Sequence, residues 1–200
     1  MPRIDAPSVR ENRTRRSADL RRAARELVIA SGPATLSMAD AALTAGLSRS
    51  AAYEYFPTRE ALLAAIVTDE LRVWAIGVSD ACASETSPSA VIETFVDTSV
   101  ELMQTGQVSP RVLAGITWLT GGPLAEVEVI TSHVSSHLRD ALAHSGVEHP
   151  DLTTRLLLTL VIEAGSAAHQ GVPHAATVAR HLIAAGVHCL AQPRTHGDGP

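Results

Sequence analysis

Helix start and stop signals divide almost the whole sequence into segments of helical length. Ser87-Pro88 and Ser109-Pro110 each place an N-cap residue before a proline, and proline is favoured at the first position of a helix. Gly32-Pro33 and Gly146 are typical of helix ends, because glycine suits the residue after a helix and proline cannot continue one. No strand-like alternation of apolar and polar residues interrupts these segments. The pattern therefore predicts an all-α chain.

Apolar residues at helical spacing between these signals predict about nine helices. The expected segments are 14–31, 37–44, 49–56, 58–82, 88–105, 110–120, 121–144, 150–170 and 174–191. The composition agrees, since 46% of the residues are hydrophobic but only 3% are aromatic, and sheets draw on aromatic and β-branched residues. Residues 1–13 and 193–200 are polar, and we expect both stretches to be disordered.

Charge is unevenly distributed along the chain. Residues 1–60 contain ten arginines against seven acidic residues, whereas residues 61–200 contain six arginines against fourteen. The arginines are densest between Arg10 and Arg25. A basic N-terminal part on an acidic body is suited to contact phosphates at one end only, although a solvated charged helix would look the same.

The segment from Leu36 to Leu63 predicts two short helices joined by a tight turn. Ser37 is placed to cap the first of them, Ala45-Gly46-Leu47 forms the turn, and Ser48 caps the second. This arrangement sets a second helix into the major groove of DNA, with the residues at its start near the base edges. Those residues are Arg49, Ser50 and Ala51, and Arg49 has the side chain that recognises guanine.

Three of the six aromatic residues, Tyr53, Tyr55 and Phe56, lie within four positions of this segment. Ala52 and Phe56 should face inward at i and i+4, and the two tyrosines cannot both share that face. At least one phenol is therefore expected on the surface, where its hydroxyl suits a phosphate oxygen.

These residues resemble the DNA-binding domain of the tetracycline-repressor (TetR) family over about residues 14–65. The matching positions are Ser37-Met38, Ala42, Ala45-Gly46-Leu47-Ser48, Tyr53, Tyr55-Phe56, Glu60 and Leu62. The chain departs from the family pattern at Ala41 and Ala52, where the family has larger apolar residues, at Ser50, where it has glycine, and at Arg59, where it has lysine. The two alanines predict a thin core for this domain.

The resemblance implies which residues contact DNA. Base contacts would come from Arg49, Ser50 and Ala51, and the residues implied to contact phosphates are Ser37, Ser48, Tyr53, Tyr55 and Arg59. With the disordered basic arm over 1–13 and the disordered tail over 193–200, the expected organisation is a helix-turn-helix domain over 14–60 and a helical domain over 61–192, to which the family assigns ligand binding and dimerisation. The partners implied are a palindromic double-stranded DNA operator, a small apolar effector and a second copy of the chain.

The bulkiest residues of the middle helices are candidates for an apolar effector pocket, and each is also compatible with plain core packing. They are Trp74, Phe95, Met103 and Trp118. His133 and His137 lie at i and i+4, a spacing that suits two metal ligands, but no third ligand is identifiable. We therefore expect them to line the pocket or the surface, with no metal and no cofactor.

Three functional interpretations follow from these patterns. A transcription repressor that leaves its operator when a small molecule binds is favoured. The alternatives are a dimeric helical adaptor whose DNA motif has decayed and a helical enzyme with a regulator-like N-terminus. The sequence contains no nucleophile–base pattern, no glycine-rich phosphate loop and no catalytic carboxylate set, so we expect that the protein is not an enzyme.

The sequence also shows no signal peptide and no membrane-spanning run, and its two cysteines are far apart. These features favour a cytoplasmic location for the protein.

Overall fold

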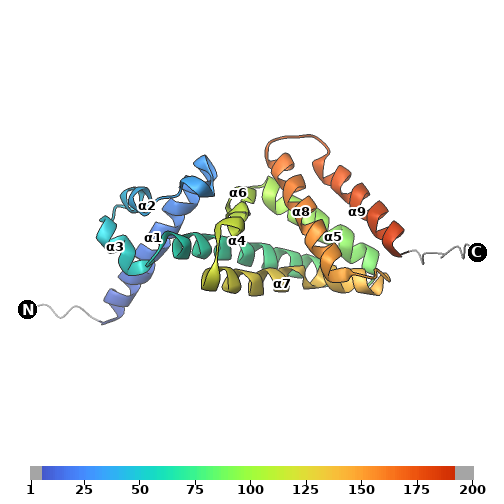
Figure 1. Cartoon of the computed structure of the whole chain (residues 1–200), viewed down its shortest axis with the longest axis horizontal. Coiled ribbons are helices and arrows are strands. Elements are labelled where there is room, and N and C mark those ends of the chain that lie inside the picture. The colour runs from blue at the N-terminus through green and yellow to red at the C-terminus, as the bar shows by residue number, and fades with distance from the viewer. Residues whose placement is uncertain (1–5, 192–200) are drawn as a thin grey trace, which may run out of the picture. The chain divides into compact units, whose positions relative to one another are not determined.

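The structure, a computed structural model, describes residues 6–191 as a succession of helices (Figure 1). The α-helices are α1 (Ala6–Ser31), α2 (Met38–Thr44), α3 (Arg49–Tyr55), α4 (Arg59–Cys82), α5 (Pro88–Gln104), α6 (Pro110–Leu113), α7 (Gly121–His144), α8 (Pro150–His169) and α9 (Ala175–Ala191). Two 3₁₀ helices, η1 (Pro33–Thr35) and η2 (Ala114–Trp118), connect them. No strand occurs within this range, so the predicted all-α class is confirmed.

The first helix is longer than expected. We predicted that it begins at Thr14, but α1 begins at Ala6. Residues 6–13 are therefore helical, where we expected disorder. The physical reason is that a proline in the first turn, here Pro7, is compatible with a helix, because the amide hydrogens of that turn have no partner within the helix. The other part of that prediction, residues 1–5, and the predicted tail 193–200 lie outside the described residues.

The chain forms two compact units. The first contains the described residues up to Glu70 together with Arg111–Val129. Within it, α1 packs against η1 and α2, and α2 packs against α3. The fully buried side chains of this unit include Leu20, Ala41, Ala52 and Leu62. The unit thus extends past residue 60, where we placed the end of the DNA-binding domain; that functional boundary stays a prediction.

The predicted helix 110–120 is divided into α6 and η2, and a buried glycine lies within η2. Gly115 is buried, and a Cβ atom at this position would lie 3.0 Å from Leu63 Cδ1 and 3.3 Å from Val67 Cγ2. The missing side chain lets the η2 backbone approach α4 closely.

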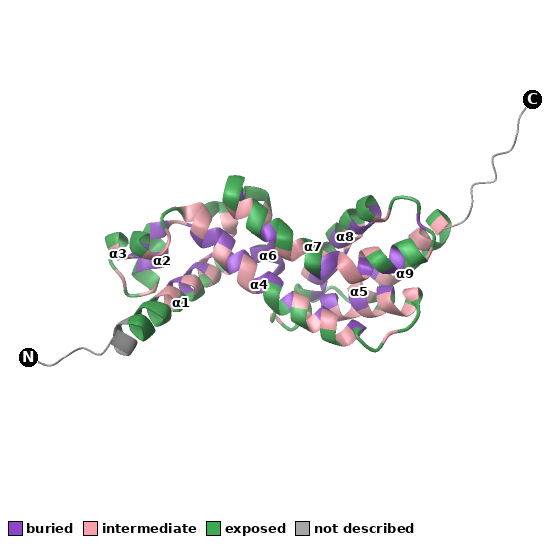
Figure 2. Cartoon of the chain, turned by 90° about the horizontal axis from the view of Figure 1, so that it is seen from below, coloured by how far each residue is buried: buried purple, intermediate pink, exposed green. Residues whose placement is uncertain are grey.

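The second unit contains Leu71–Pro110 and the described residues from Ile130 onward. Its centre is α5, which packs against both α8 and α9. In Figure 2 most residues of α5 are buried or half-buried, whereas α9 presents mostly exposed positions. None of the described helices is long and apolar enough to cross a lipid bilayer.

Candidate nucleic-acid interface

The helix α2 is fixed at both ends by local hydrogen bonds. At its start the Ser37 hydroxyl accepts a bond from the Asp40 amide at 3.1 Å and donates to the Asp40 carboxylate at 2.7 Å. At its end Gly46 adopts a φ of 67°, and the Leu47 amide donates to the Ala42 carbonyl at 2.8 Å. This is a Schellman ending, which requires a left-handed residue that glycine supplies without strain. The predicted turn is therefore formed by local chemistry.

The helix α3 begins directly after this turn. The Ser48 hydroxyl accepts a bond from the Ala51 amide at 3.2 Å and lies 3.0 Å from the Ser50 hydroxyl. Arg49 and Ser50 are exposed, and Ala51 is half-buried. The three residues that we predicted to contact bases thus lie on the first turn of an exposed helix, which is the part of a recognition helix that enters the major groove.

Aromatic and basic side chains lie next to each other along α3. Tyr53 is 41% exposed, which confirms that a phenol of this cluster lies on the surface. The Arg49 guanidinium carbon lies 5.8 Å from the centre of the Tyr53 ring. Ala52 is fully buried as predicted, whereas Phe56 is only half-buried. Tyr55 is also half-buried, and the Arg13 guanidinium of α1 lies 5.6 Å from its ring centre. Cation–π contacts of this kind hold the guanidinium groups of Arg13 and Arg49 beside α3.

The structure gives Arg59 different partners from those that the resemblance implied. Its Nε donates to the Leu36 carbonyl at 2.8 Å, and one terminal nitrogen donates to the carbonyls of Pro33 and of Ala34. The other terminal nitrogen lies 3.5 Å from the Glu60 carboxylate. The guanidinium thus contacts the main chain around η1, and its implied phosphate contact stays untested. Sequence reasoning missed this role because the carbonyls lie more than twenty residues away, and no local pattern marks them.

The arginines of α1 divide into two groups. Arg21 forms an ion pair with Asp69 at 2.8 Å, and Arg25 pairs with the buried carboxylate of Glu70, both on α4. The N-terminal half of the helix contains four exposed arginines, Arg10, Arg13, Arg15 and Arg16, whereas Arg22, also exposed, pairs with Asp19 within α1. The first group joins α1 to α4, and the second supplies exposed positive charge on the same unit as α3.

The predicted pocket residues lie in two different units. Trp74, Phe95 and Met103 are fully buried in the second unit, where the Trp74 indole nitrogen donates to the Ser99 hydroxyl at 2.8 Å. Trp118 belongs to the first unit and is 50% exposed.

The two histidines of this set differ in their surroundings. His137 is half-buried and lies 3.1 Å from the Ser79 hydroxyl, whereas His133 is exposed. Among the described residues there is no group of three or more His, Cys, Asp and Glu side chains that would hold a metal ion.

Residues 20–66 match the family described as bacterial regulatory proteins, tetR family. This part of the chain is therefore similar to the DNA-binding segment of the TetR family. The helix-turn-helix described above, α2–turn–α3, lies wholly within the matched residues. A comparison with curated proteins found no match.

Solved structures of TetR-family proteins share the fold over almost their whole length. A TetR-family regulatory protein from Rhodococcus RHA1 aligns with a TM-score of 0.71 at 17% identity, covering 88% of this chain and 96% of that one. The regulator PfmR from Thermus thermophilus aligns with a TM-score of 0.64 at 22% identity, covering 85% and 97%. AibR, solved with isovaleryl coenzyme A and operator DNA, aligns with a TM-score of 0.64 at 18% identity, covering 89% and 99%. The chain therefore has the TetR fold beyond the TetR-family segment as well.

Proposed function

We propose that this protein is a one-component transcription repressor that binds a palindromic DNA operator as a homodimer. The observation that carries the proposal is the exposed first turn of α3, where Arg49 and Ser50 follow a capped, tightly turned α2 within a TetR-family domain. In this proposal Arg49, Ser50 and Ala51 contact base edges. Phosphates are contacted by Tyr53, by Tyr55 and by the first turns of α2 and α3, whose free amide groups and helix dipoles attract anions.

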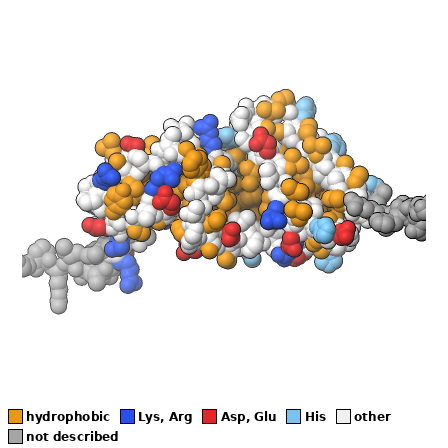
Figure 3. Space-filling view, viewed as in Figure 1, with side chains coloured by type: hydrophobic (Ala, Val, Ile, Leu, Met, Phe, Trp, Pro, Cys, Tyr) orange, Lys and Arg blue, Asp and Glu red, His pale blue; other side chains and the backbone are white. Residues whose placement is uncertain are grey.

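The apolar surface of α8 and α9 supports a homodimer. Leu152, Leu156, Val178, Leu182 and Leu190 are each about half exposed or more. Hydrophobic side chains are visible over this part of the molecule in Figure 3. Exposed apolar side chains that gather on one part of a protein surface mark association surfaces.

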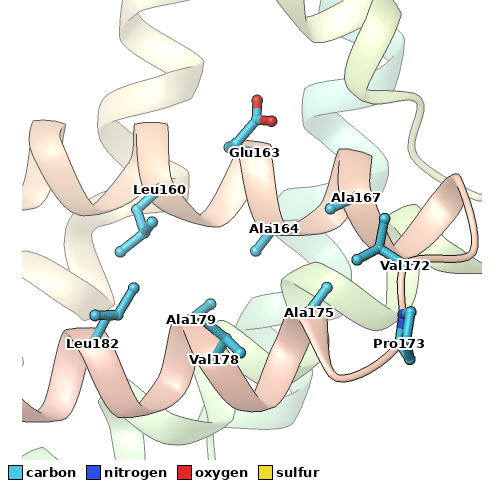
Figure 4. Close-up of a pocket in the computed structure, with 10 residues that line it drawn as sticks. All are labelled: Leu160, Glu163, Ala164, Ala167, Val172, Pro173, Ala175, Val178, Ala179 and Leu182. Carbon is cyan, nitrogen blue, oxygen red and sulfur yellow. The ribbon is translucent and has the colours of Figure 1, made fainter.

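A groove of about 230 Å³ lies between α8 and α9, and its apolar lining supports the same proposal (Figure 4). Leu160 and Leu182 point into the groove from opposite helices, whereas Glu163 points away from it. A second copy that packs its own α8 and α9 here would form a four-helix interface. Such a dimer presents two recognition helices to two half-sites about 34–36 Å apart.

A small apolar effector is the remaining part of the proposal. AibR was solved with both a coenzyme A thioester and operator DNA, which supports an effector for this fold. The candidate effector contacts of the second unit are Trp74, Phe95, Met103, His133 and His137, and Trp118 of the first unit stays a separate candidate. An effector would release the operator only if it bound better to the conformer with low DNA affinity. We propose that the protein acts in the cytoplasm and has no catalytic activity.

Selecting bound duplexes from a pool of random sequences tests sequence-specific DNA binding, and it does not require that the operator is known. We expect an inverted repeat to be enriched, and the selected duplex to bind more tightly than a scrambled one in fluorescence anisotropy. Arg49→Ala should lose about tenfold of this preference, because a bidentate arginine–guanine contact contributes about 1–3 kcal/mol of discrimination.

Arg139→Ala is the matched control, because Arg139 lies on α7 in the second unit and pairs there with Asp140. It should leave the preference unchanged. If folded wild-type protein enriched no sequence over successive rounds, the repressor proposal would be wrong, and the adaptor or enzyme interpretation would take its place. An enriched duplex that no apolar thioester or acid displaces would contradict only the effector part.

A further inference from the structure

The helix-turn-helix of this chain has an apolar core made largely of alanine. The residues of α2 and α3 that are buried are Met38, Ala41, Ala42 and Ala52. An alanine buries a single methyl group, so it contributes less apolar area than the larger residues that the family places at positions 41 and 52. Two short helices held by so few apolar contacts need other interactions to keep a fixed orientation.

Arg59 supplies such an interaction at the start of α2. This residue opens α4, and its side chain is 25% exposed. Its guanidinium donates to the carbonyls of Pro33 and Leu36, which flank the segment that leads directly into the Ser37 cap. Arginine presents several N–H donors in a rigid fork, and a lysine ammonium cannot reproduce that planar geometry. The side chain therefore fixes the entry into α2 relative to α4.

Arg13 supplies a second interaction, at the end of α3. Its guanidinium lies 5.6 Å from the centre of the Tyr55 ring, and one nitrogen lies 3.4 Å from the Glu54 carbonyl, to which it donates. Tyr55 is the last residue of α3, so the cation lies where the carbonyls of the final turn carry partial negative charge. The extension of α1 toward its N-terminus brings this side chain within reach of α3.

We propose that Arg13 and Arg59 are positioning residues for the recognition helix and thereby determine sequence discrimination. They hold the two ends of the α2–turn–α3 segment, and they act through the main chain and Tyr55 without contacting bases. This inference rests on the proposed DNA-binding function. It also assigns Arg59 a task different from the phosphate contact that the family resemblance implies.

Salt dependence separates the two roles. A residue that contacts a phosphate weakens binding to all sequences when it is removed, and it lowers the salt slope by about 0.9 per contact. A residue that only orients α3 lowers the affinity for the selected duplex and leaves the affinity for a scrambled duplex and the salt slope unchanged. Lysine substitution retains the charge and removes the fork, so it isolates the orienting role.

The test compares Arg13→Lys, Arg59→Lys and Arg59→Gln with the wild type on the selected and scrambled duplexes at several salt concentrations. Each lysine variant should lose at least about fivefold in the ratio of selected to scrambled affinity, with an unchanged salt slope. Arg16→Lys is the matched control, because Arg16 is another exposed arginine of α1, and it should behave as the wild type. Thermal unfolding identifies any variant that fails to fold. Because Arg13 is exposed, we expect Arg13→Lys to fold even if the Arg59 variants do not.

Wild-type affinity ratios from lysine variants that fold would overturn the inference. An equal loss on both duplexes with a lower salt slope for Arg59→Gln would assign Arg59 to phosphate binding instead. Hydrogen exchange of the amides in residues 38–55 is independent of DNA. It should be faster in Arg13→Lys and Arg59→Lys than in Arg16→Lys, and equal exchange would also overturn the inference. If the wild type itself showed no sequence preference, the proposed function would fail, and the exchange experiment alone would decide the positioning role.

Discussion

Cys82 and Cys189 have opposite surroundings, and this difference governs their chemistry. Cys82 ends α4 and is buried, whereas Cys189 is exposed on α9. Burial raises the pKa of the Cys82 thiol, and the negative charge of Glu85 raises this pKa further. The reactive form of cysteine is the thiolate, so Cys82 should react slowly in the folded protein.

We expect a thiol-reactive reagent to label Cys189 in the native protein and Cys82 only after unfolding, as measured by peptide mass spectrometry. The raised pKa also predicts the sign of a pH effect, because the folded state keeps the Cys82 proton at pH values where the unfolded chain has lost it. The stabilisation from this group is complete below the ordinary thiol pKa and is lost as the pH rises through the raised value. Cys82→Ala should therefore lose less stability over that alkaline range than the wild type, and an equally steep loss would contradict the prediction.

Gly165 of α8 limits the distance between α8 and α5, because it lies against Met103 of α5. A Cβ atom on Gly165 of α8 would overlap Met103 Sδ and lie 2.9 Å from Met103 Cβ, and Met103 of α5 is fully buried. The α5–α8 contact therefore depends on a missing side chain in α8. A larger residue there would force the two helices apart.

Gly165→Ala should destabilise the fold by about 1–3 kcal/mol, the usual cost of overpacking a dense core. Gly186→Ala is the matched control, because a Cβ atom at that position in α9 meets nothing within 4 Å. This second change should be neutral or stabilise by up to about 1 kcal/mol, since alanine loses less conformational freedom than glycine in a helix. Urea unfolding of both variants checks the prediction, and equal midpoints for the two would refute it.

The proposed dimer would depend on a surface that a single chain leaves exposed. The α8–α9 groove and the leucines beside it remain accessible in one copy, although they are as apolar as core residues. Burying that surface against a second copy would remove it from water, which is the main driving force for association.

Leu182→Glu should convert the dimer into a monomer, because each interface would then bury an unpaired carboxylate. Val129→Glu is the control, since Val129 is an exposed apolar residue of α7 in the first unit. Sedimentation equilibrium distinguishes a dimer from the 21.0 kDa chain. A monomeric wild type, or dissociation by Val129→Glu to the same degree, would contradict the proposed interface.

Most helix boundaries of this protein were predicted because their causes lie within a few residues. Serine caps at positions 37, 48 and 87, the left-handed Gly46 and prolines at the starts of α5, α6 and α8 act on adjacent backbone groups. The same local chemistry identified the α2–turn–α3 segment and its exposed first turn. The start of α1 was missed because a polar, proline-containing stretch is compatible both with disorder and with a helix.

The sequence by itself thus determined the helical class, the order of the helices and the residues that a recognition helix would present. Only the tertiary structure showed that Arg59 contacts main-chain carbonyls, that Arg13 reaches Tyr55, and that Trp118 is half exposed while Trp74 is buried. The physical reason is how far apart in the sequence the interacting residues lie. Caps and turns are satisfied by neighbours in sequence, whereas the partner of an arginine fork or a large aromatic ring is set by which helices pack together, and no local pattern records that choice.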